Sequence, residues 1–422
     1  MAEKPLPRNV KALGVVSLLA DVSSEMIFPL LPLFLTTVLG ASAAMLGAIE
    51  GLAETVAAML KLASGWWSDR VRSRKPLVVA GYAISALVRP VIAVAAAPWH
   101  ILVARVADRV GKGIRSSPRD ALIADVTPAA DRGRAYGFHR AADNFGAVLG
   151  PLVAWLMLQQ GGFELRTVFL WASVPAFISV IVLLVFVREA RAKTTATLSA
   201  DAAPVAAPAQ TATVAAMAET PTAALGAPFW RYLAVVFVFT LGCSTDAFLL
   251  LRASQLGVPI AWIPILWAAH NLVKAAASVP GGRLSDRIGR RVPIISGWAI
   301  YAAVYLLFGF ASEAWHAWAL MLTYGLYFGL TEGAEKALVA DLVPAGRRGA
   351  GFGWFNFTIG IAALPASLVF GLVWDSYGPL AAFSMGASLA ALATLGLLVL
   401  VPAKALATQP APNETVKAGV VD

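Results

Sequence analysis

The chain has 422 residues, of which 59% are hydrophobic and 14% charged, and its formal net charge is +9. A typical soluble domain carries about 25% charged residues, so a soluble protein of this composition would expose large apolar patches, and disordered chains are more polar still. The composition excludes a typical cytosolic enzyme and a disordered chain, and it indicates a polytopic membrane protein. The single cysteine, Cys243, argues against a disulfide framework or a cysteine-based metal site.

Apolar stretches long enough to cross a bilayer recur along the whole chain. A spanning helix needs about 20 mostly apolar residues, and the alternating pattern typical of barrel strands is not seen. We therefore predict an all-α polytopic membrane protein with twelve transmembrane helices. Their expected ranges are 12–39, 43–67, 76–96, 98–120, 133–161, 165–188, 228–256, 259–283, 292–311, 314–341, 348–375 and 379–402.

The segment between the sixth and seventh predicted helices has a different composition. Residues 194–226 are rich in Ala, Thr and Pro and contain no Lys, Arg or aromatic residue. Such a tract buries too little apolar area to offset the entropy lost on ordering. We interpret it as a flexible linker, with a regulatory or partner-binding role as the alternative. The expected domains are a six-helix bundle at 1–190, the linker at 191–227, a second six-helix bundle at 228–403 and a tail at 404–422.

Lys and Arg are concentrated in every second loop. Arg72, Arg74 and Lys75, for example, follow the second predicted helix, whereas the loops near residues 40, 97, 162, 258, 312 and 377 contain no Lys or Arg. The positive-inside rule predicts that both termini and the linker are cytoplasmic and that the chain lies in the cytoplasmic (inner) membrane. The positive charge then reports topology and contact with anionic lipid, so nucleic acid is not an expected partner.

The two halves of the chain repeat each other. Residues 121–138 align without gaps on residues 337–354 at an offset of 216, with nine of eighteen positions identical. The run 65–70, at the end of the second helix, likewise matches the run 282–287 at the end of the eighth. Paired segments that lie six helices apart keep the same orientation in the membrane. The halves are therefore expected to be parallel repeats about an axis along the membrane normal.

With these features the chain resembles a transporter of the major facilitator superfamily over nearly its whole length. The loop signature of that family, G-x-x-x-D-R-x-x-R/G-R-R/K, resembles residues 65–75 and 282–291, although the first copy is one residue longer and has Ser73 where Gly is common. More narrowly, residues 111–120 and 270–274 resemble a poorly characterised prokaryotic branch. The run 146–151 resembles the helix-5 motif of exporters, although Val153 and Ala154 replace the usual small pair.

The loop signature has a physical interpretation as a gate. A carboxylate at the end of one helix can accept the N–H groups, and complement the positive dipole, of a facing helix N-terminus. The resemblance implies that such contacts close the cytoplasmic side and break on inward opening. The alternative is topological charge beside an ordinary helix end. The gating candidates are Gly65, Asp69, Arg70, Arg74, Gly282, Asp286, Arg287 and Arg290.

Ionisable residues inside the predicted helices are the sharpest functional signal. A charge at the centre of a membrane helix costs about 2.5–3.5 kcal/mol on insertion scales, so it should face a cavity or a partner. Asp21 and Glu25 share one face of the first helix, and a carboxyl group removed from water can exchange a proton near neutral pH. A structural ion pair is the alternative for each acid. The proton-coupling candidates are Asp21, Glu25, Glu54, Asp143 and Asp246.

Further polar residues are candidates for the lining of a substrate cavity. On the fourth helix Arg105, Asp108 and Arg109 belong to one polar stripe. Structure and function are equally good interpretations of this stripe, because Arg109 could instead hold Asp143 of the fifth helix. Histidines can relay protons or simply pack, and for Trp267, Tyr324 and Tyr327 we favour packing. The cavity candidates are Arg89, Arg105, Arg109, His139, His270, Asn271, Lys274 and Glu332.

These observations predict a secondary transporter that works by alternating access. We expect proton-coupled export of a small organic solute, drug-like or metabolite, with Glu25 and Asp21 cycling protons. A symporter of an anionic solute held by Arg89, Arg105 or Arg109 is the alternative, and a transport-inactive membrane sensor or scaffold is an alternative of another class. The sequence carries no Walker motif or nucleophile–base motif, so we expect neither an ATP-driven pump nor an enzyme. No cofactor or metal is expected, and the chain is expected to be monomeric.

Overall fold

The computed structural model describes residues 6–68, 73–127, 132–188, 225–344 and 348–401. Within these ranges the secondary structure is helical and contains no strand, which confirms the predicted all-α fold. Helices overlap all twelve predicted apolar stretches. Most of the predicted linker, 191–227, and all of the predicted tail, 404–422, lie outside the described residues.

The first half begins with a helix that changes its geometry where prolines occur. Helix α1 (Arg8–Ile27) continues through η1 (Phe28–Leu30), the short α2 (Leu31–Leu33) and the π-helical η2 (Phe34–Val38). Pro29 and Pro32 lack an N–H donor, and regular α-helical hydrogen bonding is therefore interrupted there. The remaining helices of this half are α3 (Ala43–Ser68), α4 (Lys75–Ala93), α5 (Pro98–Asp125), α6 (Arg132–Gln159), α7 (Leu165–Trp171) and α8 (Ser173–Phe186).

The second half differs from the predicted ranges at one point. The seventh stretch, predicted as a continuous helix, is broken into α10 (Ala227–Gly242) and α11 (Ala247–Gln255). Carbonyl groups at the break accept hydrogen bonds from the next helix: Tyr301 Oη donates to Gly242 O at 3.3 Å, and Tyr305 Oη donates to Ser244 O at 3.4 Å. A membrane helix can be interrupted where neighbouring side chains satisfy the freed backbone groups.

The helices after the break follow the predicted order. Helix α12 (Ile263–Ile288) is preceded by η4 (Ile260–Trp262), and α13 (Arg291–Phe310), α14 (Ala314–Leu342) and α15 (Arg348–Leu400) follow. Within α15, Gly378 has a φ of 82° and separates the eleventh and twelfth predicted stretches. By length and hydropathy alone, nine helical segments of the described chain are apolar enough to cross a membrane, and one of them, 351–400, contains two predicted stretches. Helices α5 and α14 are not among the nine.

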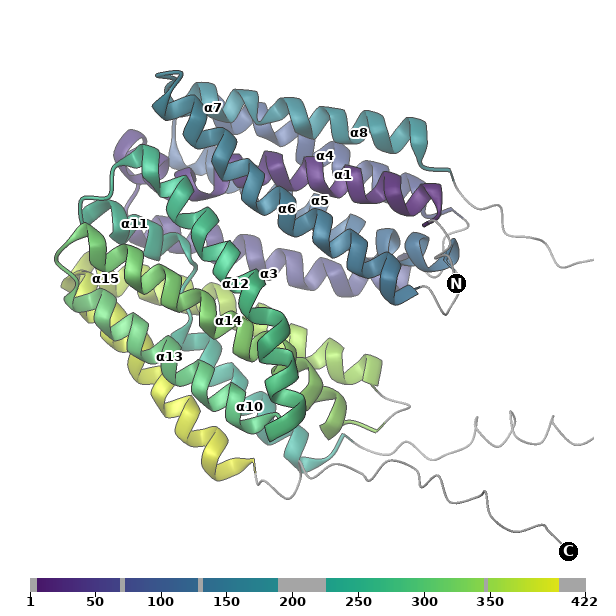
Figure 1. Ribbon diagram of the computed structural model, residues 1–422. Coiled ribbons are helices and arrows are strands. Elements are labelled where there is room, and N and C mark those ends of the chain that lie inside the picture. The colour runs from purple at the N-terminus through teal and green to yellow at the C-terminus, as the bar shows by residue number, and fades with distance from the viewer. Residues whose placement is uncertain (1–5, 69–72, 128–131, 189–224, 345–347, 402–422) are drawn as a thin grey trace, which may run out of the picture.

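The helices form two bundles whose long axes run side by side. Figure 1 shows the first half in purple and blue and the second half in green and yellow, with α1 beginning and α15 ending at the same end of the molecule. We call this the terminal end, and the opposite one the far end. The two bundles converge at the far end and diverge toward the terminal end.

Helices α3 and α15 form a close seam between the halves. A Cβ atom on Gly47 would lie 2.0 Å from the carbonyl oxygen of Ser367, and one on Gly371 would lie 2.4 Å from the carbonyl oxygen of Ala43. These distances are shorter than van der Waals contact, so only glycine fits at these two positions. The seam therefore brings backbone against backbone over much of its length.

A carboxylate joins the two halves at the far end. Asp375, near the end of the first span of α15, accepts hydrogen bonds from the backbone N–H groups of Ala43 at 2.9 Å and Ala44 at 2.7 Å. These groups belong to the first turn of α3, whose N–H donors have no partner within the helix. The negative charge also complements the positive end of the α3 dipole. Asp375 of the second half thus caps a helix of the first.

The internal repeat extends to details of the helix ends. Helices α5 and α14 begin 216 residues apart, the offset found in the sequence. In the first half, His100 Nδ1 accepts the N–H groups of Ala96 and Ala97 at 3.2 and 3.1 Å. Its counterpart His316 accepts those of Ser312 and Glu313 at 3.4 and 3.0 Å. The same residue type caps the same helix in both halves.

Candidate substrate cavity

A cavity of about 440 Å³ lies between the two halves. Helices α1, α3 and α5 contribute its first-half wall, and the α10–α11 break with α12, α13, α14 and α15 contributes the second-half wall. Its volume is within the range of sites that enclose small organic molecules. Most of the lining residues lie away from both ends of their spans, and the cavity is therefore inside the bundle.

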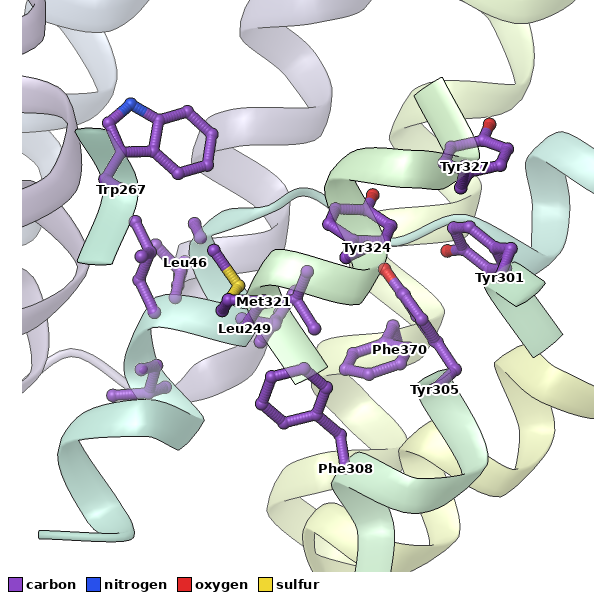
Figure 2. Close-up of a cluster of buried hydrophobic side chains, with 14 of the residues drawn as sticks. Leu46, Leu249, Trp267, Tyr301, Tyr305, Phe308, Met321, Tyr324, Tyr327 and Phe370 are labelled. Carbon is purple, nitrogen blue, oxygen red and sulfur yellow. The ribbon is translucent and has the colours of Figure 1, made fainter. Parts of the chain in front are cut away.

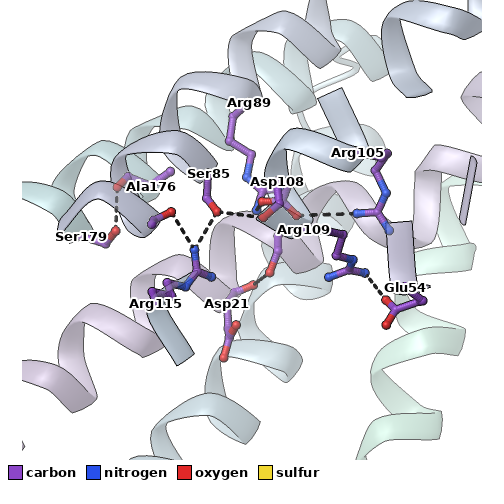
Figure 3. Close-up of polar contacts among 12 residues, drawn as sticks. Asp21, Glu54, Ser85, Arg89, Arg105, Asp108, Arg109, Arg115, Ala176 and Ser179 are labelled. Carbon is purple, nitrogen blue, oxygen red and sulfur yellow. Dashed lines mark hydrogen bonds and ion pairs between the residues drawn. The ribbon is translucent and has the colours of Figure 1, made fainter. Parts of the chain in front are cut away.

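The first-half wall is built from ion pairs. Arg105 forms a bidentate pair with Glu50, with Nε–Oε1 at 2.8 Å and Nη2–Oε2 at 2.5 Å, and the two side chains are 4% and 3% exposed. Arg109 Nη2 lies 2.8 Å from Glu54 Oε1, as Figure 3 shows. Planar guanidinium–carboxylate pairs of this kind hold both partners in a fixed geometry. Two of the three arginines predicted to line a cavity do so, each bound to a glutamate of α3.

The third arginine, Arg89, lies behind this wall. Its Nη2 donates to Asp108 Oδ1 at 3.1 Å, and Arg105 Nη1 lies 3.9 Å from Asp108 Oδ2, so the two guanidinium groups approach this carboxylate from two sides (Figure 3). All three side chains are buried, and removal of one member of a buried ion pair strands the other. The polar stripe of α5 is therefore divided, with Asp108 facing α4 and Arg109 facing the cavity.

The second-half wall is aromatic. Trp267, Tyr301, Tyr324 and Tyr327 line the cavity, and Figure 2 shows the three tyrosines close together on α13 and α14. Tyr324 and Tyr327 stack with ring centroids 5.7 Å apart, and His270 stacks between Trp267 and Tyr324 at 5.2 Å from each. These rings pack against neighbouring side chains, as predicted, and they also line the cavity.

Two cavity acids accept hydrogen bonds from aromatic donors. Trp267 Nε1 donates to Glu25 Oε2 at 2.7 Å, and Tyr324 Oη donates to Asp246 Oδ1 at 2.8 Å. The first bond crosses from one half to the other, because Glu25 is on α1 and Trp267 is on α12. Of the five predicted proton-coupling residues, Glu25, Glu54 and Asp246 line the cavity.

The other two predicted acids lie away from the cavity. Asp21 faces α6, where a Cβ atom on Gly146 would come within 2.9 Å of its own Cβ. Asp143 Oδ2 lies 3.5 Å from Nδ1 of His139, one turn earlier on the same helix. The suggested Arg109–Asp143 pair is wrong, because Arg109 is instead paired with Glu54 across the α3–α5 contact.

The remaining cavity candidates also lie outside the lining. His270 is 1% exposed, and its Nδ1 is 3.0 Å from the carbonyl oxygen of Met321. Asn271 donates to the carbonyl of Trp267 on its own helix, and Lys274 Nζ lies 4.0 Å from the centroid of the Phe328 ring. Glu332 pairs with Lys336 at 3.1 Å, and both side chains are about half exposed.

The structure describes only part of the predicted gate. Asp69, Arg70 and the side chain of Asp286 lie outside the described residues, and Gly65 is described only as part of helix α3. Arg74 is half-buried, Arg287 is exposed, and space is open beside Gly282. Arg290 Nε lies 3.4 Å from Asp341 Oδ2, and both residues belong to the second half.

The α10–α11 break supplies lining residues that the sequence analysis missed. Thr240, Cys243, Ser244 and Thr245 line the cavity beside Asp246. Four consecutive polar or small residues, 243–246, interrupt an otherwise apolar stretch. That interruption is the sequence feature that indicates the break. It is missed when hydropathy is averaged over the whole span.

Comparison with known proteins places the chain in a family. The family model described as Major Facilitator Superfamily matches residues 13–364 and 247–421. An uncharacterized MFS-type transporter of Methanocaldococcus jannaschii is 31% identical over 406 residues, which cover 94% of this chain and 96% of that protein. The multidrug resistance protein MdtH of Photorhabdus laumondii is 31% identical over 158 residues, or 36% of this chain and 39% of that protein.

Solved structures share the fold at low sequence identity. The peptide transporter POT in complex with sulfate superposes with a TM-score of 0.74 at 15% identity, covering 95% of this chain and 96% of that one. The nucleoside transporter NupG gives a TM-score of 0.73 at 15% identity, covering 93% and 98%. Together with the repeated helical halves and the cavity between them, these matches lead to one conclusion. The chain belongs to the Major Facilitator Superfamily of transporters.

Proposed function

We propose that this transporter exports a small organic solute across the cytoplasmic membrane in exchange for protons. The observation that carries the proposal is the bond between Glu25 and Trp267, which places a titratable group at the cavity and at the contact between the halves. An acid in that position can sense both the occupant of the cavity and the relative position of the halves. Glu54 and Asp246, which also line the cavity, are secondary coupling candidates.

Protonation of Glu25 would change the contact between the halves. An ionised carboxylate accepts a stronger hydrogen bond from an indole N–H than a neutral carboxyl group does. Loss of the charge therefore weakens the Glu25–Trp267 bond and favours separation of α1 from α12. Exchange of a proton at Glu25 would in this way shift the balance between two conformations of the transporter.

The molecule is proposed to face the cytoplasm in this conformation. We assign the terminal end to the cytoplasmic side, in agreement with the distribution of Lys and Arg. The Asp375 cap and the packing of Trp155 on Trp262, with centroids 5.9 Å apart, hold the halves together at the far end. In the opposite conformation, Asp69 and Asp286 would close the cytoplasmic side. Since one chain supplies both walls of the cavity, we propose that it works as a monomer.

Export is favoured over uptake of an anion by two observations. The partial relatives named multidrug resistance protein match about a third of the chain, and the arginines predicted to hold an anionic solute are already paired. Arg105 and Arg109 are each bound to a glutamate, and Arg89 is bound to Asp108 behind the wall. Binding an anion at Arg89 or Arg105 would require a buried pair to be broken, at the cost of a stranded buried charge, and binding at Arg109 would displace Glu54, which is half exposed.

Proton flux in proteoliposomes tests the coupling role of Glu25. We expect wild-type protein to move protons when a transported solute is added, and Glu25→Gln to abolish this flux while solute binding persists, because the amide cannot release a proton. Glu164→Gln, which removes a carboxylate from an exposed loop position, is the matched control and should keep the flux. Solute-dependent proton flux that survives in Glu25→Gln would remove this residue as the coupling group.

A further inference from the structure

The second-half wall of the cavity carries one acid and no strong base. Among the described lining residues of that half, Asp246 is the acidic one, and neither Lys nor Arg is present. Tyr301, Tyr324 and Tyr327 line the same wall. Ring faces carry negative electrostatic potential, and a cation beside several of them is attracted to each. A carboxylate among aromatic rings is therefore an environment suited to positive charge.

The break in the seventh span presents Asp246 to the cavity. Asp246 immediately precedes α11, and its side chain makes no capping hydrogen bond to that helix. The carboxylate instead accepts a hydrogen bond from Tyr324 at 2.8 Å. The positive end of the α11 dipole still lies beside it and favours a negative charge there. The negative charge is thus held at the wall by a helix end and a phenol, which leaves it available to a solute cation.

The aromatic surface around Asp246 is fixed before any solute binds. Trp267 is held by its bond to Glu25 and by Phe28, with ring centroids 5.1 Å apart. Tyr301 stacks on Tyr305 at 4.2 Å. Rings that are already immobilised lose little conformational entropy when a ligand is added, so more of the contact energy contributes to affinity.

The charge balance of the whole cavity points in the same direction. Among the described residues that line the cavity, four are acidic and three are basic. Arg105 and Arg109 each form an ion pair with a glutamate of α3. A cation can approach the second-half wall without disturbing either pair. The lining acids are Glu25, Glu50, Glu54 and Asp246, and the lining bases are Arg105, Arg109 and Lys112.

We propose that the transported solute is an organic cation, an amine or quaternary onium ion with an apolar body. Its charge lies beside the carboxylate of Asp246, and its body lies against Trp267, Tyr324 and Tyr327. This assignment rests on the proposed function and gives the chemical class of the solute. It also divides the work between the halves, with recognition on the second-half wall and proton exchange at Glu25 of the first.

A pair of ions with the same shape and opposite charge tests the assignment. Tetraphenylphosphonium and tetraphenylborate differ in the sign of the charge, and binding of each to the purified full chain is measured by calorimetry. We expect the phosphonium to bind and Asp246→Asn to lower its affinity by about tenfold or more, because the charge partner is lost. Glu164→Gln should leave the affinity unchanged. Equal or tighter binding of the borate, or an unchanged phosphonium affinity in Asp246→Asn, would overturn the proposal.

Cys243 supplies a second measurement that does not depend on an Asp246 variant. It is the single cysteine of the chain and lines the same cavity. We expect tetraphenylphosphonium to slow its reaction with a maleimide in wild-type protein and tetraphenylborate to leave the rate unchanged. Protection by both ions alike, or by neither, would contradict the cation assignment.

The two proposals fail in different experiments. If the protein binds the phosphonium but neither it nor any other bound solute crosses the membrane of proteoliposomes or moves protons there, export is wrong and the cation site stands. If the binding experiments favour the borate, the cation site is wrong, and solute-driven proton flux still decides whether the protein is a coupled exporter.

Discussion

The two halves have the same arrangement of helices, but the side chains at the centre of each half are of different types. On α4 and α5 the central side chains are charged and paired, whereas on α13 and α14 they are aromatic and stacked. The helices correspond at the repeat offset, so the positions can be compared directly. At an offset of 216 residues, Ser85, Arg89, Arg105, Asp108 and Lys112 correspond to Tyr301, Tyr305, Met321, Tyr324 and Phe328.

The difference shows that one backbone arrangement can be stabilised in two ways. Buried ions require partners at fixed positions, because each charge gives up its hydration. Stacked rings gain energy from contact area and from edge-to-face or offset geometry, and they tolerate small displacements. The first half therefore has a wall of paired charges and the second a wall of stacked rings around one acid, which suits the division between proton exchange and solute recognition proposed above.

The largest expected effect comes from converting a first-half position into its second-half counterpart. Arg105→Met introduces the residue found at 321 and leaves Glu50 and Asp108 without a shared cation. We expect it to lower the free energy of unfolding by about 3–5 kcal/mol, the typical cost of breaking a buried pair from one side. Denaturant unfolding of the purified protein measures it. The double variant Arg105→Met with Glu50→Gln should recover part of this loss. If the changes in the free energy of unfolding caused by the two single variants simply add up in the double variant, the Arg105–Glu50 pair does not stabilise the protein.

A smaller effect is expected from a polar deletion on the aromatic side. Tyr301→Phe keeps the ring and its stacking on Tyr305 but removes the hydroxyl that bonds the carbonyl of Gly242 at the α10–α11 break. We expect a loss of about 0.5–1.5 kcal/mol in the free energy of unfolding, the value of one ordinary hydrogen bond. The same denaturant experiment applies, with Tyr82→Phe, a buried tyrosine of α4 in the first half, as the comparison. A cost as large as that of Arg105→Met would mean that the second half also depends on its polar groups.

The smallest effect concerns the contact that holds the two halves together at the far end. Asp375→Asn removes the charge that complements the α3 dipole and one of the two oxygens that accept the N–H groups of Ala43 and Ala44. Because this helix end is partly exposed to solvent, we expect a loss of about 1 kcal/mol or less. We expect Cys243 to react about twofold to fivefold faster with a membrane-impermeant thiol reagent added from the far side. Glu313→Gln, which removes a carboxylate from the same end but within one half, is the control. An unchanged rate in Asp375→Asn would show that this cap does not hold the far end closed.

The fold could be predicted from the sequence because its signals are local and repeated. Each span is an apolar stretch of the required length, and the match of 121–138 to 337–354 sets the relation between the halves. The break at 243–246 escaped prediction because its backbone groups are satisfied by Tyr301 and Tyr305, two helices further along the chain. A hydropathy profile contains no information about such distant partners.

The site was predictable in its residue types and less so in its pairings. Charges inside predicted membrane helices marked Glu25 as a proton-coupling candidate and Arg105 and Arg109 as cavity candidates, because such a charge should face a cavity or a partner. The pairing of Arg109 with Asp143, raised as an alternative, is not the one formed, because which carboxylate Arg109 meets depends on which helices are neighbours around the bundle. The aromatic wall was underestimated for a different reason. A ring that packs on one face and lines a cavity on the other has the same sequence pattern as a ring that only packs.

The glycine seam between α3 and α15 has a mechanical consequence. Surfaces made of backbone and glycine present few side-chain ridges that must disengage, so two helices in such contact can roll on each other with little repacking. The seam runs beside the cavity, with Gly51 lining it directly. The two bundles can rotate relative to each other about this contact. A methyl group at position 47 or 371 would push the two backbones apart and hinder that rotation.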